Sequence, residues 1–183
     1  AIVSCSALKR AYRDRIRAHA PGVVFVFLHG DAQTLRQRKQ KRMRVMLEGR
    51  LPHGVTVKDV ILALIERIGT TGGVGHAIEY AGEAIASLSM EARMTLCNMS
   101  IEAGARAGMI APDATTAAYL RGRDGVPSGR EFDELTDRWR ELHTEDGATF
   151  DSEVVIPVSD SGPMITWGIN PSQAVRFDRP LPR

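Results

Sequence analysis

Residues 56–69 carry the clearest helical pattern in the chain. Thr56 and Asp59 have the spacing of a capping box, with aspartate as a shorter stand-in for glutamate, and Gly69 supplies a stop. The apolar side chains between them recur with the period of a helix, at Val57, Val60, Ile61, Leu64, Ile65 and Ile68. The pattern predicts an amphipathic helix whose apolar face is buried in a core and carries no chemistry.

Further along the chain, helix and strand patterns alternate. Ser89 is positioned to cap a helix that carries residues 94–106, and Asp113 to cap a helix through Leu120. A third helix is predicted at 131–142, with Leu135, Trp139 and Leu142 facing inward. A glycine-rich turn at 69–75 leads into a strand, and further strands are predicted at 154–158 and 164–168. After Asn170 the chain is rich in proline and charge. This alternation predicts a layered α/β fold.

The first thirty residues form a separate pattern. An apolar strand to Cys5, a basic amphipathic segment at 8–18 and a second apolar run at 23–28 predict a βαβ unit. Residues 5–14 and 25–30 resemble the middle of the gluconate kinase family, which implies a P-loop kinase fold. The chain contains no G-x-x-x-x-G-K-[ST] motif to hold a triphosphate, so the resemblance does not predict phosphoryl transfer. A remnant gluconate kinase is kept as an alternative, with ATP binding as its test.

Composition excludes several classes of protein. The 183 residues are 43% hydrophobic and 25% charged with a formal net charge of +2, so the chain has no overall polyelectrolyte character. The longest apolar stretch, residues 21–28, is too short to span a bilayer, and no secretory leader is evident. The sequence therefore predicts a cytoplasmic protein that does not contact membranes. Cys5 and Cys97 are its only cysteines, which excludes a disulfide scaffold.

A basic run occupies residues 36–44. Six of its nine positions are cationic, namely Arg36, Arg38, Lys39, Lys41, Arg42 and Arg44. A non-catalytic module that binds nucleic acid through this run is one alternative function. No aromatic residue interrupts the run to stack on bases, so the pattern favours a solvated face over a nucleic-acid interface.

The run from Cys97 to Gly108 places Asn98 and Glu102 four residues apart among small or apolar side chains. On a helix this spacing puts both polar heads on one face, where burial is costly without a partner or a task. The pattern alone leaves an alternative, in which Asn98 is a capping or satisfied core amide and Glu102 faces solvent. Cys97 is predicted to be a small buried hydrophobe. His76 and His143 have no second ligand at metal-binding spacing and are predicted to be structural.

Three motifs carry a second resemblance: the run 97–108, His76–Ile85 and Thr166–Pro171. Together they resemble the large subunit of 3-isopropylmalate dehydratase, a family within the aconitase family, over residues 32–183. Homoaconitase-type paralogues are close alternatives. Val74 and Ile169 stand where this family usually has threonine. The two resemblances predict two domains, a gluconate-kinase-like piece at 1–31 and an aconitase-like α/β/α piece at 32–183. With the start at Ala1, they predict a central fragment joined to an unrelated segment.

The resemblance implies a chemistry. Enzymes of this family interconvert 2-isopropylmalate and 3-isopropylmalate by dehydration and rehydration in leucine biosynthesis, with a small subunit that completes the active site. Their [4Fe-4S] cluster binds substrate, and the resemblance implies that Asn98 and Glu102 are catalytic side chains that hold the reacting water. A cluster of this kind is held by cysteine thiolates, and two cysteines cannot supply three. We therefore expect this chain alone to hold no cluster or other metal and to be inactive.

Overall fold

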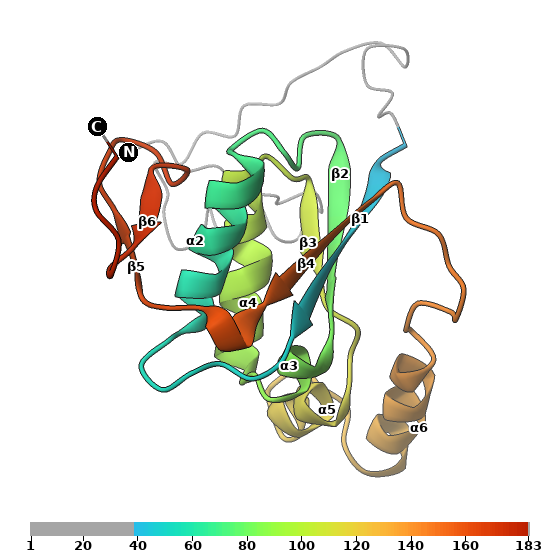
Figure 1. Ribbon diagram of the computed structural model, residues 1–183. Helices are drawn as coiled ribbons and strands as arrows, with labels where there is room; N and C mark the ends of the chain where they lie inside the picture. Colours follow the sequence, from blue (N-terminus) through green and yellow to red (C-terminus); the bar gives the residue numbers. More distant parts are fainter. Residues whose placement is uncertain (1–38, 183) are drawn as a thin grey trace, which may run out of the picture. The chain divides into compact units, whose positions relative to one another are not determined.

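The computed structural model of the chain describes residues 39–182 (Figure 1). The βαβ unit and the kinase resemblance predicted for residues 1–31 lie outside the described residues. The described elements are β1 (Lys41–Glu48), α2 (Val57–Ile68), β2 (His76–Ala81), α3 (Glu83–Ala86), α4 (Met90–Met99), β3 (Ala107–Met109), α5 (Ala114–Leu120), α6 (Gly129–Arg140), β4 (Ser152–Pro157), β5 (Met164–Thr166) and β6 (Ala174–Arg176). Two 3-10 turns follow α4 and β4, at Ser100–Ala103 and Val158–Asp160. The prediction of a mixed α/β fold is confirmed.

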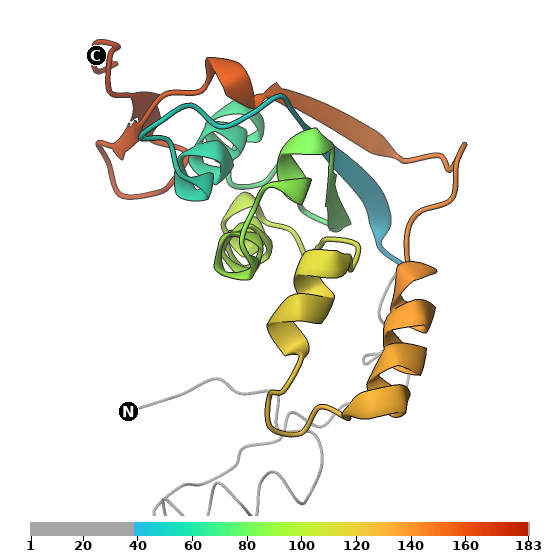
Figure 2. The same ribbon diagram turned by 90° about the horizontal axis from the view of Figure 1, so that it is seen from below.

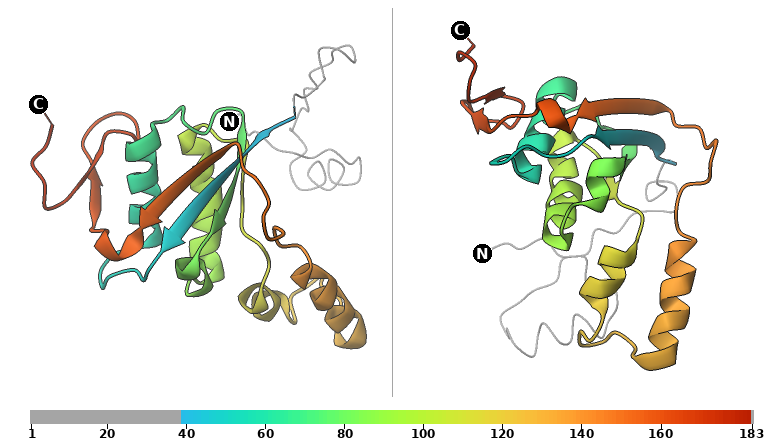
Figure 3. Two further views of the ribbon diagram at one scale, coloured as in Figure 1. Left: turned by 45° about the vertical axis from the view of Figure 1, so that its right-hand side comes forward. Right: turned by 60° about the horizontal axis from the view of Figure 1, so that its bottom comes forward.

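Four strands form a parallel sheet in the order β3-β2-β1-β4. The three longest, β4, β1 and β2, run in the same direction in Figure 3. Val45 of β1 lies opposite Tyr80 on one side and Val154 on the other. The two short strands β5 and β6 form a separate antiparallel pair.

Strand β1 begins inside the basic run. The sequence analysis did not predict this strand, because it interpreted the run only by its charge. Met43, Val45 and Leu47 of this strand are buried in the core, while Arg42 and Arg44 alternate with them on the other face. There Arg42 lies 3.8 Å from the Asp151 carboxylate and Arg44 lies 2.8 Å from that of Glu153. Two cations of the run are therefore paired with acids of the same protein.

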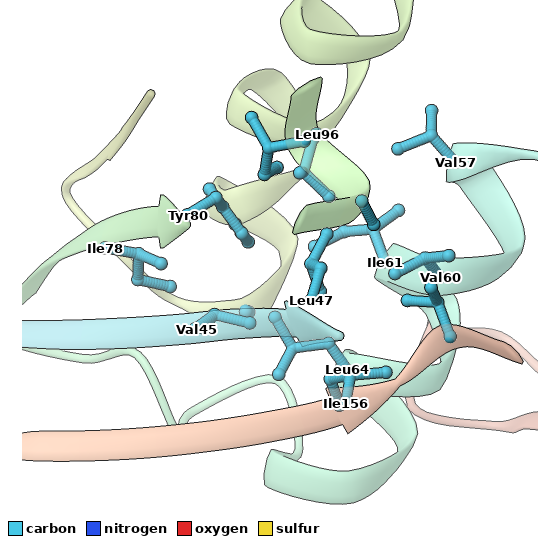
Figure 4. Packing of buried hydrophobic residues seen from close by; sticks show 14 of the residues in the cluster. Val45, Leu47, Val57, Val60, Ile61, Leu64, Ile78, Tyr80, Leu96 and Ile156 are labelled. Atoms are coloured by element: carbon cyan, nitrogen blue, oxygen red, sulfur yellow. The ribbon is translucent and has the colours of Figure 1, made fainter. Parts of the chain in front are cut away.

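The core lies between the sheet and the helix that was predicted at residues 56–69. In Figure 4 the side chains of Val60, Ile61 and Leu64 from α2 point toward Leu47 of β1 and Ile156 of β4. The predicted helix is confirmed, with Thr56 as N-cap and Gly69 as C-cap, although Ile68 is only half-buried. Burial of this apolar face supplies most of the driving force for placing α2 on the sheet.

Helices α2, α3 and α4 all lie on one face of the sheet (Figures 1 and 3). Within residues 39–182 no helix covers the opposite face, which carries Arg44, Glu79 and Val155. The second helical layer of the predicted α/β/α arrangement is thus not formed by this part of the chain. Helices α5 and α6 extend away from the sheet (Figure 2).

The inward face predicted for α6 is confirmed only in part. Phe132 is buried instead, at 1% exposure, with Arg121 4.5 Å above its ring and Trp139 in an edge contact at 6.1 Å. Leu142 lies beyond the end of the helix and is 64% exposed. Leu135 and Trp139 are half-buried, because the buried stripe is centred one turn earlier than the leucine spacing indicated.

Helix α4 is shorter than the predicted segment through Arg106. Ser89 caps it as predicted, accepting a hydrogen bond from the Ala92 amide at 3.3 Å, but the helix ends at Met99. Gly104 then adopts a left-handed conformation, with φ of 85°, and β3 begins at Ala107. A Cβ on Gly108 would lie 2.8 Å from the Cys97 carbonyl oxygen. The 3-10 turn and the left-handed Gly104 therefore lead the chain from α4 into β3, which packs closely on the end of the helix.

The carboxyl-terminal part contains one strand that was not predicted. Strand β5 begins at the predicted residue and β4 begins two residues earlier than predicted. The predicted helix at α5 follows its Asp113 cap. Strand β6 lies in the segment rich in proline and charge. Its Ala174 and Val175 are buried, which shows that tertiary contacts decided this strand where the local sequence gave no signal.

Candidate functional site

The predicted pair Asn98 and Glu102 lies at the junction between α4 and the following 3-10 turn. Asn98 is in the last turn of the helix and Glu102 is in the 3-10 turn, so the two do not share one continuous α-helix. Both side chains are exposed, and neither makes a hydrogen bond or ion pair to other residues of 39–182. Glu102 therefore faces solvent, as in the alternative that the pattern alone left open, and both polar heads are available to other molecules.

A buried hydrogen bond holds this junction in place. The Tyr80 hydroxyl lies 2.7 Å from Ser100 Oγ, which in turn donates to the Leu96 carbonyl oxygen at 3.0 Å. The Tyr80 hydroxyl is therefore the donor to Ser100. Burial raises the pKa of Tyr80 to about 12. The phenol stays neutral and anchors the turn that presents Glu102.

Glu102 lines a cleft of about 530 Å³ together with segments far from it in sequence. One wall is the start of α2, with Lys58 and Asp59, and the other is the connection from β5 to β6. The remaining lining residues are Thr56, Leu62, Met99, Met164, Thr166, Gly168, Ile169, Asn170 and Pro171. The structure thus brings Glu102 to the Thr166–Pro171 motif. Asn98 is not among the lining residues.

The β5–β6 connection is held by its own side chains. Gln173 Oε1 accepts hydrogen bonds from the Ile169 amide at 2.7 Å and the Asn170 amide at 3.3 Å. Asn170 Oδ1 accepts from the Ser172 amide at 3.0 Å and from its hydroxyl at 2.6 Å. These bonds fix a turn on which Ile169 is fully exposed at the edge of the cleft.

Asp59 joins the two walls of the cleft. Its Oδ2 accepts from the Thr56 amide at 2.8 Å, and its Oδ1 accepts from the Met164 amide at 2.8 Å. Burial raises the pKa of Asp59, but the hydrogen bonds from Met164 and Thr56 together outweigh it, so the net pKa is lowered. The capping box was evident from the sequence; the bond to Met164, 105 residues away, was not.

The residues that could hold a metal lie apart. Cys97 is half-buried on the other side of α4, facing a second cavity, and burial raises the pKa of its thiol. His76 Nδ1 lies 3.0 Å from the Val74 carbonyl oxygen, and His143 Nδ1 lies 2.9 Å from that of Arg140. Among residues 39–182 no three histidine, cysteine, aspartate or glutamate side chains are grouped as metal ligands.

Comparison with known protein families matches residues 30–183 to the Aconitase family (aconitate hydratase). The chain belongs to the aconitase family. The match covers the sheet, the cleft and both motifs that meet in it. Aconitate hydratase is a hydro-lyase, so the chain belongs to a family of lyases. No helix within the described range 39–182 has the length and apolar content needed to cross a membrane.

Aconitase-family enzymes typically carry a [4Fe-4S] cluster, and the residues present do not fit one. A cubane needs three thiolates, whereas the described part of this aconitase-family chain contributes the single thiol of Cys97. The raised pKa of that thiol disfavours the thiolate form that binds iron. No step of a reaction can therefore be assigned to a cluster held by these residues.

Proposed function

We propose that this chain contributes Asn98 and Glu102 to a hydro-lyase of the 3-isopropylmalate dehydratase type. The reaction interconverts 2-isopropylmalate and 3-isopropylmalate by loss and return of water, in leucine biosynthesis. The family match supports the reaction class. The His76–Ile85 and Ser100–Gly108 runs support this substrate over that of aconitase. The proposal includes a cytoplasmic location and a small subunit as the partner that completes the active site.

The observation that carries this proposal is the position of Glu102 in the cleft with the Thr166–Pro171 motif. An exposed carboxylate at this point can accept a proton from a substrate carbon and give it to the departing hydroxyl, and it can reverse both transfers when water returns. The Lys58 ammonium, which also lines the cleft, can attract a substrate carboxylate. The Asn98 amide, exposed one turn away, can orient a polar group without adding charge.

The chain alone should be catalytically silent. After anaerobic treatment with iron and sulfide followed by desalting, we expect no visible absorbance of a bound cluster and no conversion of isopropylmalate, because the two cysteines of the chain, Cys5 and Cys97, cannot supply three thiolates. A complete dehydratase treated in parallel is the positive control. A cluster that survives desalting, or conversion by this chain alone, would contradict the prediction.

Removal of the positive charge of Lys58 and removal of the negative charge of Glu102 should have opposite effects on substrate binding to the cleft. Isopropylmalate is a dianion, so Lys58→Gln should weaken its binding and Glu102→Gln should strengthen it, each by up to about fivefold because both side chains are solvent-exposed. The readout is NMR of methyl-labelled methionine, since Met99 and Met164 line the cleft. Lys41→Gln, an exposed lysine of β1 outside the cleft, is the matched control. Equal effects of Lys58→Gln and Lys41→Gln would show that binding is non-specific.

A further inference from the structure

An unpaired edge of the β5–β6 pair borders the cleft described above. In this antiparallel pair the Trp167 amide donates to the Gln173 carbonyl oxygen at 2.9 Å. Successive amide groups point to opposite sides of a strand, so the Thr166 amide points away from β6, as does that of Met164. The Met164 amide confirms this direction, because it donates to Asp59 Oδ1 at the start of α2. The outward edge of β5 therefore faces the cleft.

Thr166 presents a backbone donor and a backbone acceptor on this edge. In an antiparallel pair, a residue whose amide points outward also directs its carbonyl oxygen outward. Neither group of Thr166 is hydrogen-bonded to another residue of 39–182, and the residue is exposed and lines the cleft. The previous outward amide, that of Met164, binds the Asp59 carboxylate at 2.8 Å. The same edge thus binds one carboxylate through its backbone and directs a second donor into the cleft, about 6.8 Å along the strand.

A 2-hydroxy carboxylate matches this donor and acceptor. Its hydroxyl oxygen and a carboxylate oxygen are separated by three bonds, as are the amide nitrogen and the carbonyl oxygen of one residue in a strand. The carboxylate can therefore accept from the Thr166 amide while the hydroxyl donates to the Thr166 carbonyl oxygen, as a directly opposite residue would. A peptide strand fits less well, because Asp59 occupies the Met164 amide that such a strand would also need.

The charges of the cleft allow an anion at this position. Hydrogen bonds from the Thr56 amide and hydroxyl and from the Met164 amide compensate the Asp59 carboxylate. Lys58 is the cationic side chain among the lining residues, and it is exposed, so it can attract the second carboxylate of a dicarboxylic acid. Both isopropylmalates are dicarboxylic acids with a hydroxyl group beside one carboxylate.

We propose that the backbone of Thr166 binds the 2-hydroxy carboxylate group of the substrate, with its amide on the carboxylate and its carbonyl oxygen on the hydroxyl. The identity of the substrate rests on the proposed function, whereas the chemical class, a 2-hydroxy acid, follows from the edge of β5. This contact distinguishes a hydroxy acid from the unsaturated acid that dehydration produces, because the unsaturated acid lacks the hydroxyl donor.

Titration of the whole chain with 3-isopropylmalate, malate and isopropylsuccinate tests the proposal by NMR. Isopropylsuccinate lacks only the 2-hydroxyl group of 3-isopropylmalate, so it should bind about fivefold more weakly, through loss of one hydrogen bond. The Thr166 amide proton should move downfield as either hydroxy acid binds, because a hydrogen bond to a carboxylate replaces one to water. The Trp167 amide, which is bonded within the pair, is the internal control and should move little. An unmoved Thr166 amide at saturation, or equal affinities for 3-isopropylmalate and isopropylsuccinate, would overturn the proposal.

The same titrations separate this proposal from the proposed function. If 3-isopropylmalate shifts the methyl signals of Met99 and Met164 in the cleft but not the Thr166 amide, the proposed substrate stands and this inference fails. If malate moves the Thr166 amide while 3-isopropylmalate does not bind, this inference stands and the proposed substrate fails. If neither hydroxy acid binds, both fail.

Two substitutions of Thr166 supply the second test. Thr166→Pro removes the amide proton, and no hydrogen bond of the β5–β6 pair is lost because that amide points outward. It should weaken 3-isopropylmalate binding about fivefold, whereas Thr166→Val keeps both backbone groups and should change the affinity less than about twofold. Circular dichroism and the thermal midpoint establish that each variant is folded. If Thr166→Pro does not fold, the Thr166 amide shift in the native chain decides the question. Equal affinities of the two folded variants would refute the role of the amide.

Discussion

Substitution of Gly82 by alanine is expected to lower the free energy of unfolding by about 3–5 kcal/mol, from backbone strain and overpacking combined. Gly82 connects β2 to α3 with φ of 106°, a conformation that other residues rarely adopt. An added Cβ would also meet the backbone of the central strand, contacting the Leu47 carbonyl oxygen and lying 2.8 Å from the Leu47 nitrogen. Neither atom can move without disturbing β1. Chemical denaturation followed by circular dichroism measures the loss.

Gly54→Ala is the matched control for this substitution. Gly54 also has a positive φ, of 81°, but nothing lies within 4 Å of an added Cβ. Its replacement should therefore cost only the backbone strain, about 1–2 kcal/mol. The difference between the two variants isolates the clash with β1. Equal losses would mean that the contact with Leu47 relaxes freely, and they would contradict the predicted clash.

Asp113→Asn should destabilise the chain by about 3 kcal/mol at neutral pH, because it leaves the Arg93 guanidinium buried without a counter-charge. Asparagine is as good an N-cap as aspartate, so the cap of α5 is retained and the ion pair alone is lost. Asp133→Asn is the control: its ion pair with Arg121, at 3.6 Å, is exposed on both sides and should contribute less than about 1 kcal/mol. Similar losses in both variants would contradict the prediction.

The Asp113 effect should also depend on pH. Hydrogen bonds from Arg93 lower the pKa of Asp113, and partial burial offsets this only in part. A lowered folded-state pKa contributes stability above the unfolded value of about 3.9, and this contribution is lost as the pH falls through the folded value. The difference in free energy of unfolding between the native chain and Asp113→Asn should therefore be largest at neutral pH and should disappear as the pH falls below about 4. Denaturation midpoints across this range measure it.

The elements predicted correctly are those stabilised by contacts between residues a few positions apart in the sequence. The capping pairs of Thr56 with Asp59 and of Asp113 with Thr116 bridge three positions, so the sequence shows them directly. Elements that depend on contacts between residues far apart in the sequence were not predicted, or were given wrong bounds. Strand β1 needs β2 and β4 on either side to bury its alternate residues, and α4 ends where β3 packs against Cys97.

For the candidate site, too, the sequence indicated some of the residues but not how they come together. The resemblance identified Asn98, Glu102 and Thr166–Pro171 separately, but it did not predict that Glu102 alone of the pair lines the cleft. It also did not indicate Lys58 or Asp59, which belong to a helix that the sequence marked only as core-forming.

By itself, the sequence determined the features that depend on neighbouring residues, namely the amphipathic helix α2 and the helix caps. It also determined that the chain has too few cysteines for a cubane cluster. The tertiary structure decided which distant groups meet. Glu102 reaches the Thr166–Pro171 motif because α2, the 3-10 turn and the β5–β6 pair pack together, and Asp59 bonds Met164 across 105 residues. Such contacts follow from sheet register and core packing. Many weak interactions between distant residues together decide both, so no short stretch of sequence indicates them.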